Sequence, residues 1–295
     1  QNIRTAEGIL SIKKHIAAAR IKMKGIDLWL RYLEPTAYHK VNGPLPVEWE
    51  TEVFEKFEKP YRRDGAGLGL AELYLDEPGI HKDSLIQLID SSIKVSDIYL
   101  ADSITKHLDS YHHFFLANRL FLLNLSAIYT TGFECPDAEN IIPELGSMLE
   151  SVNGIYSAYN KSYPNFPAKK EYLELYNKTI AFVKQQPTNP NEFDHYGFIK
   201  DYVNPLFSIN QQMIRDYQVV SSNFNDYSLD DNCTSIFDKK LYKGQNEKGI
   251  YLRVEDEASL NEIKAVGKLL FYDPILSGNN KRSCASCHKS TEYFT

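Results

Sequence analysis

Apolar side chains recur at spacings of three and four residues through most of the first 220 residues, and no long stretch alternates between apolar and polar. The first spacing is typical of amphipathic helices, whereas alternation is typical of half-buried strands. Prolines and glycines interrupt the helical pattern at several points, including Pro35, Gly43 and Pro164. We therefore expect an all-α fold in which residues 1–222 form a bundle of about six or seven helices.

The positions of these interruptions define the expected helices. Helices are expected at residues 5–33, 46–59, 142–160, 169–186 and 193–220. The last is expected to bend near Pro205, which has no backbone N–H to donate. Helical spacing also continues without proline over residues 83–131, a length that predicts a kink or a break.

Five basic residues lie in the first expected helix: Lys13, Lys14, Arg20, Lys22 and Lys24. Because apolar residues occupy the other face of this helix, the basic residues are predicted to form a solvated surface. A glycine-rich run follows at residues 65–69. It lacks the spacing of a dinucleotide site and the Lys-Ser/Thr of a phosphate-binding loop, so we expect a connection between helices there.

Three histidines cluster in the long helical stretch, at His107, His112 and His113, with Asp109 nearby. Their spacing matches no catalytic metal motif, and adjacent residues on a helix point in different directions. They are expected to be surface residues or hydrogen-bonded members of the core, rather than ligands of a metal or a haem.

The end of the chain carries the strongest chemical signal. Cys284, Cys287 and His288 form a Cys-x-x-Cys-His run, the attachment signal of c-type haem. Two thiols two residues apart can add to both vinyl groups of one haem, and the following imidazole can then bind the iron. Zinc binding and disulfide chemistry also use Cys-x-x-Cys, but no second such pair or His-x-x-x-His supplies further zinc ligands, and the preceding residues 273–282 have loop composition rather than a buried strand.

A longer stretch around this motif resembles a known family. The run Gly-Lys-Leu-Leu-Phe-Tyr-Asp-Pro-Ile-Leu-Ser-Gly at residues 267–278, followed by Ser-Cys-Ala-Ser-Cys-His at 283–288, is similar to the opening of bacterial di-haem cytochrome c peroxidases and the related methylamine-utilisation (MauG-type) maturation enzymes. The resemblance covers residues 260–295. The lead-in is not needed for haem attachment as such, so it selects among c-type haem proteins.

The resemblance implies specific roles. The first haem of this family is the peroxidatic one, which makes Cys284 and Cys287 the attachment residues and His288 the proximal iron ligand. Family members continue with a distal region and a second Cys-x-x-Cys-His, so a second haem is expected in a longer protein. We expect residues 1–295 to be an N-terminal fragment that is inactive as a peroxidase by itself.

A fainter resemblance covers two segments of the helical part, residues 131–136 and 198–206. They are similar to an N-terminal helical extension carried by some proteins of the cytochrome peroxidase type. That extension carries no chemistry that could be transferred to residues of this chain. The predicted domains are accordingly a helical domain at 1–222, a polar junction at 223–257 and the beginning of a c-type cytochrome domain at 258–295.

Composition and charge limit the partners. The net charge of −6 and a pI near 5.8 argue against a nucleic-acid partner. The expected partner is a small electron-donor protein or a small-molecule substrate. Covalent haem attachment implies export to the bacterial periplasm or a similar compartment, with a lipid anchor left open, and no transmembrane segment is visible. There, Cys135 and Cys233 could form a disulfide, although two unrelated buried thiols are the favoured interpretation.

The predicted function is that of a c-type haem oxidoreductase resembling di-haem cytochrome c peroxidases. Two alternatives remain open. The first is a mono-haem electron carrier fused to a helical domain, which requires a haem to be enclosed by very few residues after His288. The second is a helical module that binds a ligand or a partner.

Overall fold

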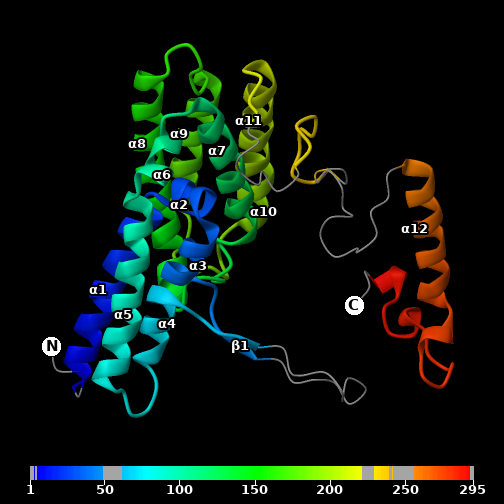
Figure 1. Ribbon diagram of the computed structural model, residues 1–295, viewed down its shortest axis with the longest axis horizontal. Coiled ribbons are helices and arrows are strands. Elements are labelled where there is room, and N and C mark those ends of the chain that lie inside the picture. Colours follow the sequence, from blue (N-terminus) through cyan, green and yellow to red (C-terminus); the bar gives the residue numbers. More distant parts are fainter. Residues whose placement is uncertain are drawn as a thin grey trace. The chain divides into compact units, whose positions relative to one another are not determined.

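The computed structural model describes residues 3, 5–48, 62–220, 229–238, 241 and 256–292. The fold is all-α, as the hydrophobic periodicity predicts, and divides into two compact units, Gln1–Leu241 and Tyr242–Thr295 (Figure 1). Most of the predicted junction at 223–257 lies outside the described residues. No helix in the described ranges is long and apolar enough to cross a membrane.

The predicted helix at 5–33 is two helices, α1 (Ala6–Lys24) and α2 (Asp27–Leu33), followed by α3 (Pro35–Asn42). Thr5 begins α1 by accepting a hydrogen bond from the Gly8 amide at 3.1 Å. The break comes at Gly25, a residue that favours the helix interior less than almost any other. The spacing alone did not reveal it because apolar residues continue in register on both sides.

The prediction that the basic residues of α1 form a solvated face is wrong for two of them. Arg20 and Lys24 are buried, on the same stripe of the helix as Ile16. Arg20 donates to both carboxylate oxygens of Glu144, at 2.9 and 3.0 Å, and to Asn42 Oδ1 at 2.8 Å. A buried cation needs such partners, because desolvation otherwise costs several kcal/mol.

Glu134 is the centre of a second group of buried hydrogen bonds, next to those of Arg20. It accepts from Lys24 Nζ at 2.8 Å and from Arg31 Nη2 at 2.7 and 2.8 Å. The Tyr38 hydroxyl accepts from Lys24 at 3.0 Å and donates to Glu134 at 3.1 Å. We call the buried ionic residues of this region the ionic cluster: Arg20, Lys24, Asp27, Arg31, Glu72, Glu134 and Glu144. The cluster links α1, α2 and α4 to α8 and to the turn that carries Glu134.

The predicted helix at 46–59 is wrong where the structure describes it. Val47 and Glu48 form strand β1 (Val47–Glu48), which pairs antiparallel with β2 (Arg62–Arg63) in the register Val47 to Arg63. Residues 49–61 lie outside the described residues. The glycine-rich run leads directly into α4 (Gly67–Tyr74), so part of the expected connection is itself helical.

Gly67 is required by a close approach of two backbone segments. Its φ is +70°, and a Cβ placed on it would lie 1.8 Å from the Val41 carbonyl oxygen. Gly67→Ala is therefore expected to lower the free energy of unfolding by at least about 2 kcal/mol, measured by urea denaturation. The matched control is Gly154→Ala in the interior of α8, where a Cβ meets nothing within 4 Å. This substitution should raise stability by about 0.5–1 kcal/mol, and equal effects at the two sites would contradict the interpretation.

The long stretch at 83–131 contains the predicted break. It forms α5 (Lys82–Ser96), η1 (Asp97–Leu100), α6 (Asp102–Thr105), η2 (Lys106–Leu108) and α7 (Tyr111–Ala127). Ser110 caps α7 by accepting from the His113 amide at 3.4 Å. Helix α7 is buried on nearly all sides and packs against α2 and α11, so it forms the centre of the first unit.

The helices that complete the bundle are α8 (Ile141–Ser162), α9 (Lys170–Gln185), α10 (His195–Gly197), the π-helical η4 (Phe198–Val203) and α11 (Asn204–Asp216); the short η3 (Ala138–Asn140) precedes α8. The predictions for α8 and α9 are confirmed. The irregularity expected near Pro205 is the π-helical segment before it, since Pro205 has no N–H for the preceding turn. Figure 1 shows α7, α8, α9 and α11 side by side.

Three tyrosines at the centre of this bundle have hydroxyls that are buried with the rest of the side chain. Tyr156, Tyr172 and Tyr176 are fully buried. Asn118 receives a hydrogen bond from Tyr156 at 2.6 Å and donates one to Tyr172 at 2.9 Å, while Tyr176 donates to the Leu149 carbonyl at 3.1 Å. Burying these hydroxyls is tolerated because each has an internal partner.

Candidate haem-attachment site

The second unit begins with α12 (Glu257–Tyr272), whose first turn is capped by Asp256. The Asp256 carboxylate accepts from the Ser259 amide at 2.7 Å and from its hydroxyl at 2.8 Å. These hydrogen bonds, with the amide's first, lower the Asp256 pKa below its ordinary value. The helix ends at Tyr272, and Asp273 caps the following turn η5 (Pro274–Leu276) by accepting from the Ile275 amide at 2.9 Å.

Ser277 organises the loop between this turn and the Cys-x-x-Cys-His run. Its hydroxyl donates to the Pro274 carbonyl at 2.8 Å and accepts from the amides of Lys281 and Arg282 at 3.1 and 3.3 Å. Asn280 has a φ of 51°, a left-handed conformation that asparagine tolerates. The Leu-Ser-Gly-Asn-Asn part of the lead-in therefore folds back on itself immediately before the cysteines.

The cysteines and the histidine lie on one tight turn. Turn η6 (Cys284–Ser286) is held by a capping box between Ser283 and Ser286. The Cys284 carbonyl accepts from the Cys287 amide at 3.2 Å and from the His288 amide at 2.9 Å. Both thiols are exposed and neither forms a disulfide. A further turn, η7 (Ser290–Glu292), follows. The sequence thus places two accessible thiols and an imidazole within one turn of backbone.

The described apolar side chains of this unit do not form a buried core. None of its described side chains is buried. The large apolar residues that are exposed are Ile263, Val266, Leu269, Tyr272, Ile275 and Leu276, and for Leu269 the exposed fraction reaches 72%. Gly267 lies among them in mid-helix, and a Cβ there would meet nothing within 4 Å. A flat apolar group attached at Cys284 and Cys287 would provide a surface against which these exposed apolar side chains could pack. The residues present therefore fit a haem.

His107 and His113 lie next to each other in the first unit, whereas His112 has a different partner. The His107 and His113 rings meet edge to face with centroids 4.9 Å apart, and His113 Nδ1 lies 2.8 Å from the Tyr32 hydroxyl. His112 Nδ1 accepts from the Val220 amide at 3.1 Å. Within the described ranges, no group of three or more His, Cys, Asp or Glu side chains could hold a metal ion.

His113 makes the stability of the first unit depend on pH. Burial, together with the nearby His107 and His112, lowers the His113 pKa from its ordinary 6.5 to about 4. The unfolded chain therefore takes up this proton first as the pH falls, and stability is lost between about pH 6.5 and 4, on the order of 1–2 kcal/mol. His113→Gln keeps an acceptor for Tyr32 and should flatten this part of the profile of unfolding free energy against pH. A wild-type slope in His113→Gln would contradict this.

The other two cysteines do not pair with each other. Cys233 is buried and Cys135 is partly buried, and both are free thiols, in line with the favoured interpretation. Burial raises the pKa of the Cys135 thiol to about 12, and Glu144 adds to the effect. Its Sγ donates to the Asp137 carbonyl at 3.2 Å. The neutral thiol is thus a structural group of the first unit.

Residues 261–295 match the family model for di-haem cytochrome c peroxidase. This match confirms, over that segment, the resemblance stated from the lead-in and the Cys-x-x-Cys-His run. No curated protein and no solved structure matches the chain. The matched segment therefore begins within α12 and includes the turn that carries both thiols.

Sequence reasoning missed two features of the molecule. Ser277 was recognised only as part of a family pattern, although its hydroxyl bonds fold the loop. The ionic cluster was missed because Glu134 lies more than a hundred residues from Lys24 and Arg31 in the chain, at separations of 110 and 103. One sequence feature could have indicated the cluster: Arg20 and Lys24 lie four and eight residues after the apolar Ile16, on the same face of the helix.

Proposed function

We propose that this protein is a c-type haem oxidoreductase that reduces peroxide with electrons from a small donor protein. The observation that carries the proposal is the single turn with two exposed thiols and His288, within a segment matching the di-haem cytochrome c peroxidase family. Export to the periplasm or an equivalent compartment follows from the chemistry of covalent haem attachment and belongs to the same proposal.

Each residue of the turn has a defined part. Cys284 and Cys287 would hold the haem through thioether bonds, and His288 would be the proximal ligand of its iron. When bound, the haem supplies reversible one-electron chemistry at iron, which amino-acid side chains do not provide. The protein positions these groups. The hydrogen bonds that the Cys287 and His288 amides donate to the Cys284 carbonyl hold the two thiols and the imidazole on one short segment.

The surroundings of the turn favour anionic partners. Lys281, Arg282 and Lys289 flank the motif and are exposed. Their charges suit the carboxylates of a haem and an acidic face on an electron-donor protein. The overall reaction takes up two electrons and two protons for each peroxide and releases two molecules of water. A second haem in a longer protein is the proposed entry point for the electrons.

The decisive experiment is an intact mass of the full-length exported product, with a reduced-minus-oxidised visible spectrum and a peroxide turnover assay. The expected results are a mass increase equal to two haems, a c-type absorption band and peroxide turnover with a reduced donor. One increment without turnover would favour the mono-haem electron carrier. Absence of both increment and band, with the attachment machinery present, would refute the haem assignment and leave the helical unit as a binding module.

A further inference from the structure

The first unit contains a second, smaller apolar core beside the main bundle. Its buried members are Ile16, Ala71, Leu75 and Leu85, contributed by α1, α4 and α5 and by the residue that follows α4. Helix α4 packs against both α1 and α5. A core with so few buried side chains leaves much of its apolar surface uncovered, because small cores bury a low fraction of their area.

An apolar cavity of about 340 Å³ opens from this core between α1 and α5. Its apolar walls include Ile12, Ile16, Leu68, Leu85, Ile86 and Ile89. Ile16 and Leu85 are buried and form its floor, whereas Ile86 is 42% exposed and stands at the mouth. The volume lies within the range of small-molecule sites, and so does the predominance of apolar walls.

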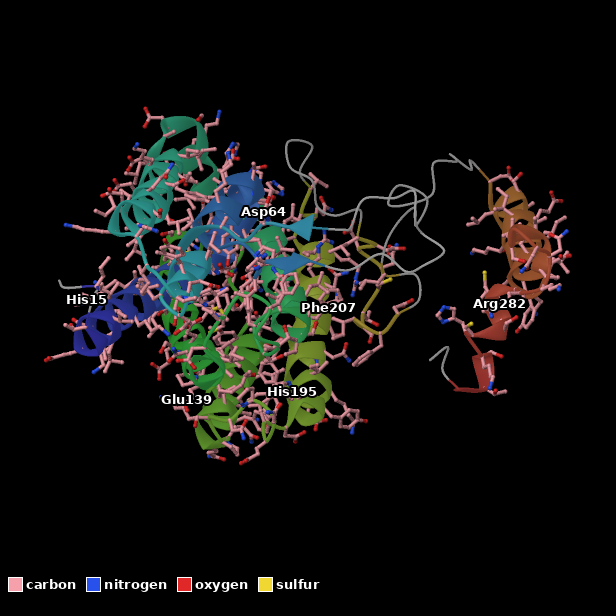
Figure 2. All side chains as sticks on the ribbon, turned by 90° about the horizontal axis from the view of Figure 1, so that it is seen from below. His15, Asp64, Glu139, His195, Phe207 and Arg282 are labelled. Carbon is pink, nitrogen blue, oxygen red and sulfur yellow. The ribbon has the colours of Figure 1, made fainter. Side chains whose placement is uncertain are left out.

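Two polar side chains line the same cavity, and both can carry positive charge. They are Lys82, in the first turn of α5, and His15 on α1. Figure 2 labels His15. The described lining contains no carboxylate. His15 Nδ1 lies 2.6 Å from the Ser11 carbonyl, so it donates there and leaves Nε2 to meet a ligand.

We propose that this cavity binds a single-chain carboxylate amphiphile, that is, a free fatty acid of medium chain length. Its alkyl chain lies along the isoleucine and leucine walls, and its carboxylate meets Lys82 and His15 at the mouth. Burial of the chain supplies the affinity, because each buried methylene contributes about 0.8 kcal/mol. The cationic mouth selects an anionic head over a cationic one. This site is independent of the haem chemistry proposed for the other unit.

The test is a calorimetric titration of the full chain with sodium dodecanoate below its critical micelle concentration. Saturable one-to-one binding is expected, and it should weaken about fourfold for each methylene removed toward octanoate. Dodecyltrimethylammonium, which has the same chain and the opposite charge, should bind at least tenfold more weakly.

Three substitutions on α5 separate the proposed site from general detergent binding. Ile86→Asp places a carboxylate at the mouth and should weaken dodecanoate binding at least tenfold, and Lys82→Glu should weaken it about fivefold. Ile93→Asp is the matched control, since Ile93 is 58% exposed on the same helix but does not line the cavity. It should leave binding unchanged. Circular dichroism melts establish that all three variants fold.

Several results would overturn the proposal. Equal binding of the cationic amphiphile, or equal losses in Ile86→Asp and Ile93→Asp, would show unspecific adsorption. Binding to anionic phospholipid vesicles without binding to monomeric dodecanoate would assign the groove to a membrane surface. Dimerisation in analytical ultracentrifugation that Ile86→Asp abolishes would assign it to a second copy of this chain.

Discussion

Replacing Glu134 with alanine is expected to lower the free energy of unfolding by about 3–5 kcal/mol, measured by urea denaturation. The substitution leaves the buried Lys24 and the partly buried Arg31 without the carboxylate that both of them contact, at 2.8 and 2.7 Å. The loss is large because two cations, rather than one, lose their partner. Arg31 Nε and Asp27 Oδ1 are already buried without hydrogen-bond partners, so the cluster has little capacity to compensate.

The matched control is Glu150→Ala, which breaks an ion pair with Lys184 at the surface. The two side chains are 52% and 60% exposed, so the loss should stay below about 1 kcal/mol. Comparable losses at Glu134 and Glu150 would contradict the assignment of the cluster to the buried interior.

The lowered pKa of Glu134 predicts that the stability of the protein falls in acid. Burial alone would raise the Glu134 pKa, but the charges of Lys24 and Arg31 and their hydrogen bonds outweigh it and lower the pKa to about 2. The unfolded chain therefore binds this proton first as the pH falls. Its contribution to stability is present above about pH 4.5 and is lost toward pH 2. Glu134→Ala should lack this part of the acid-induced loss.

The second large effect concerns haem. In the full-length exported protein, the double substitution Cys284→Ser and Cys287→Ser is expected to remove one haem increment from the intact mass, because no thiol remains to form a thioether at this turn. Cys135→Ser is the control and should keep the full haem content, since its thiol is partly buried in the helical unit. Retention of every haem by the double variant would refute the site, and loss of haem from Cys135→Ser would show that the assay reports misfolding instead.

Some elements could be predicted from the sequence because their information is local. Helices α8 and α9 were predicted within two residues at each end, since each is a strongly periodic segment bounded by proline or polar turns. The two thiols and the imidazole of the turn at 284–288 are close in sequence, so their grouping needs no tertiary contact. The break between α5 and α7 was expected because the helical stretch was too long for one helix, although its position was not predicted.

Other features depend on contacts that a helical pattern does not contain. The charge of Lys24 suggested a solvated face, and only the approach of Glu134 from a distant turn makes its burial favourable. The strand pair β1 and β2 replaced the beginning of a predicted helix because Val47 finds a backbone partner in Arg63. The cavity beside Ile16 and Leu85 likewise arises from how α4 holds α1 and α5, which no single segment specifies.

The lack of buried side chains in the described part of the second unit has a consequence for biogenesis. The helical unit possesses its own core and precedes the second unit in the chain, so it can fold before a haem is added in the proposed maturation. An attachment enzyme would have to reach both thiols and the apolar edge of the haem at once, and the exposure of Cys284 and Cys287 permits this. The attached haem would then be the surface against which the exposed apolar side chains of α12 pack.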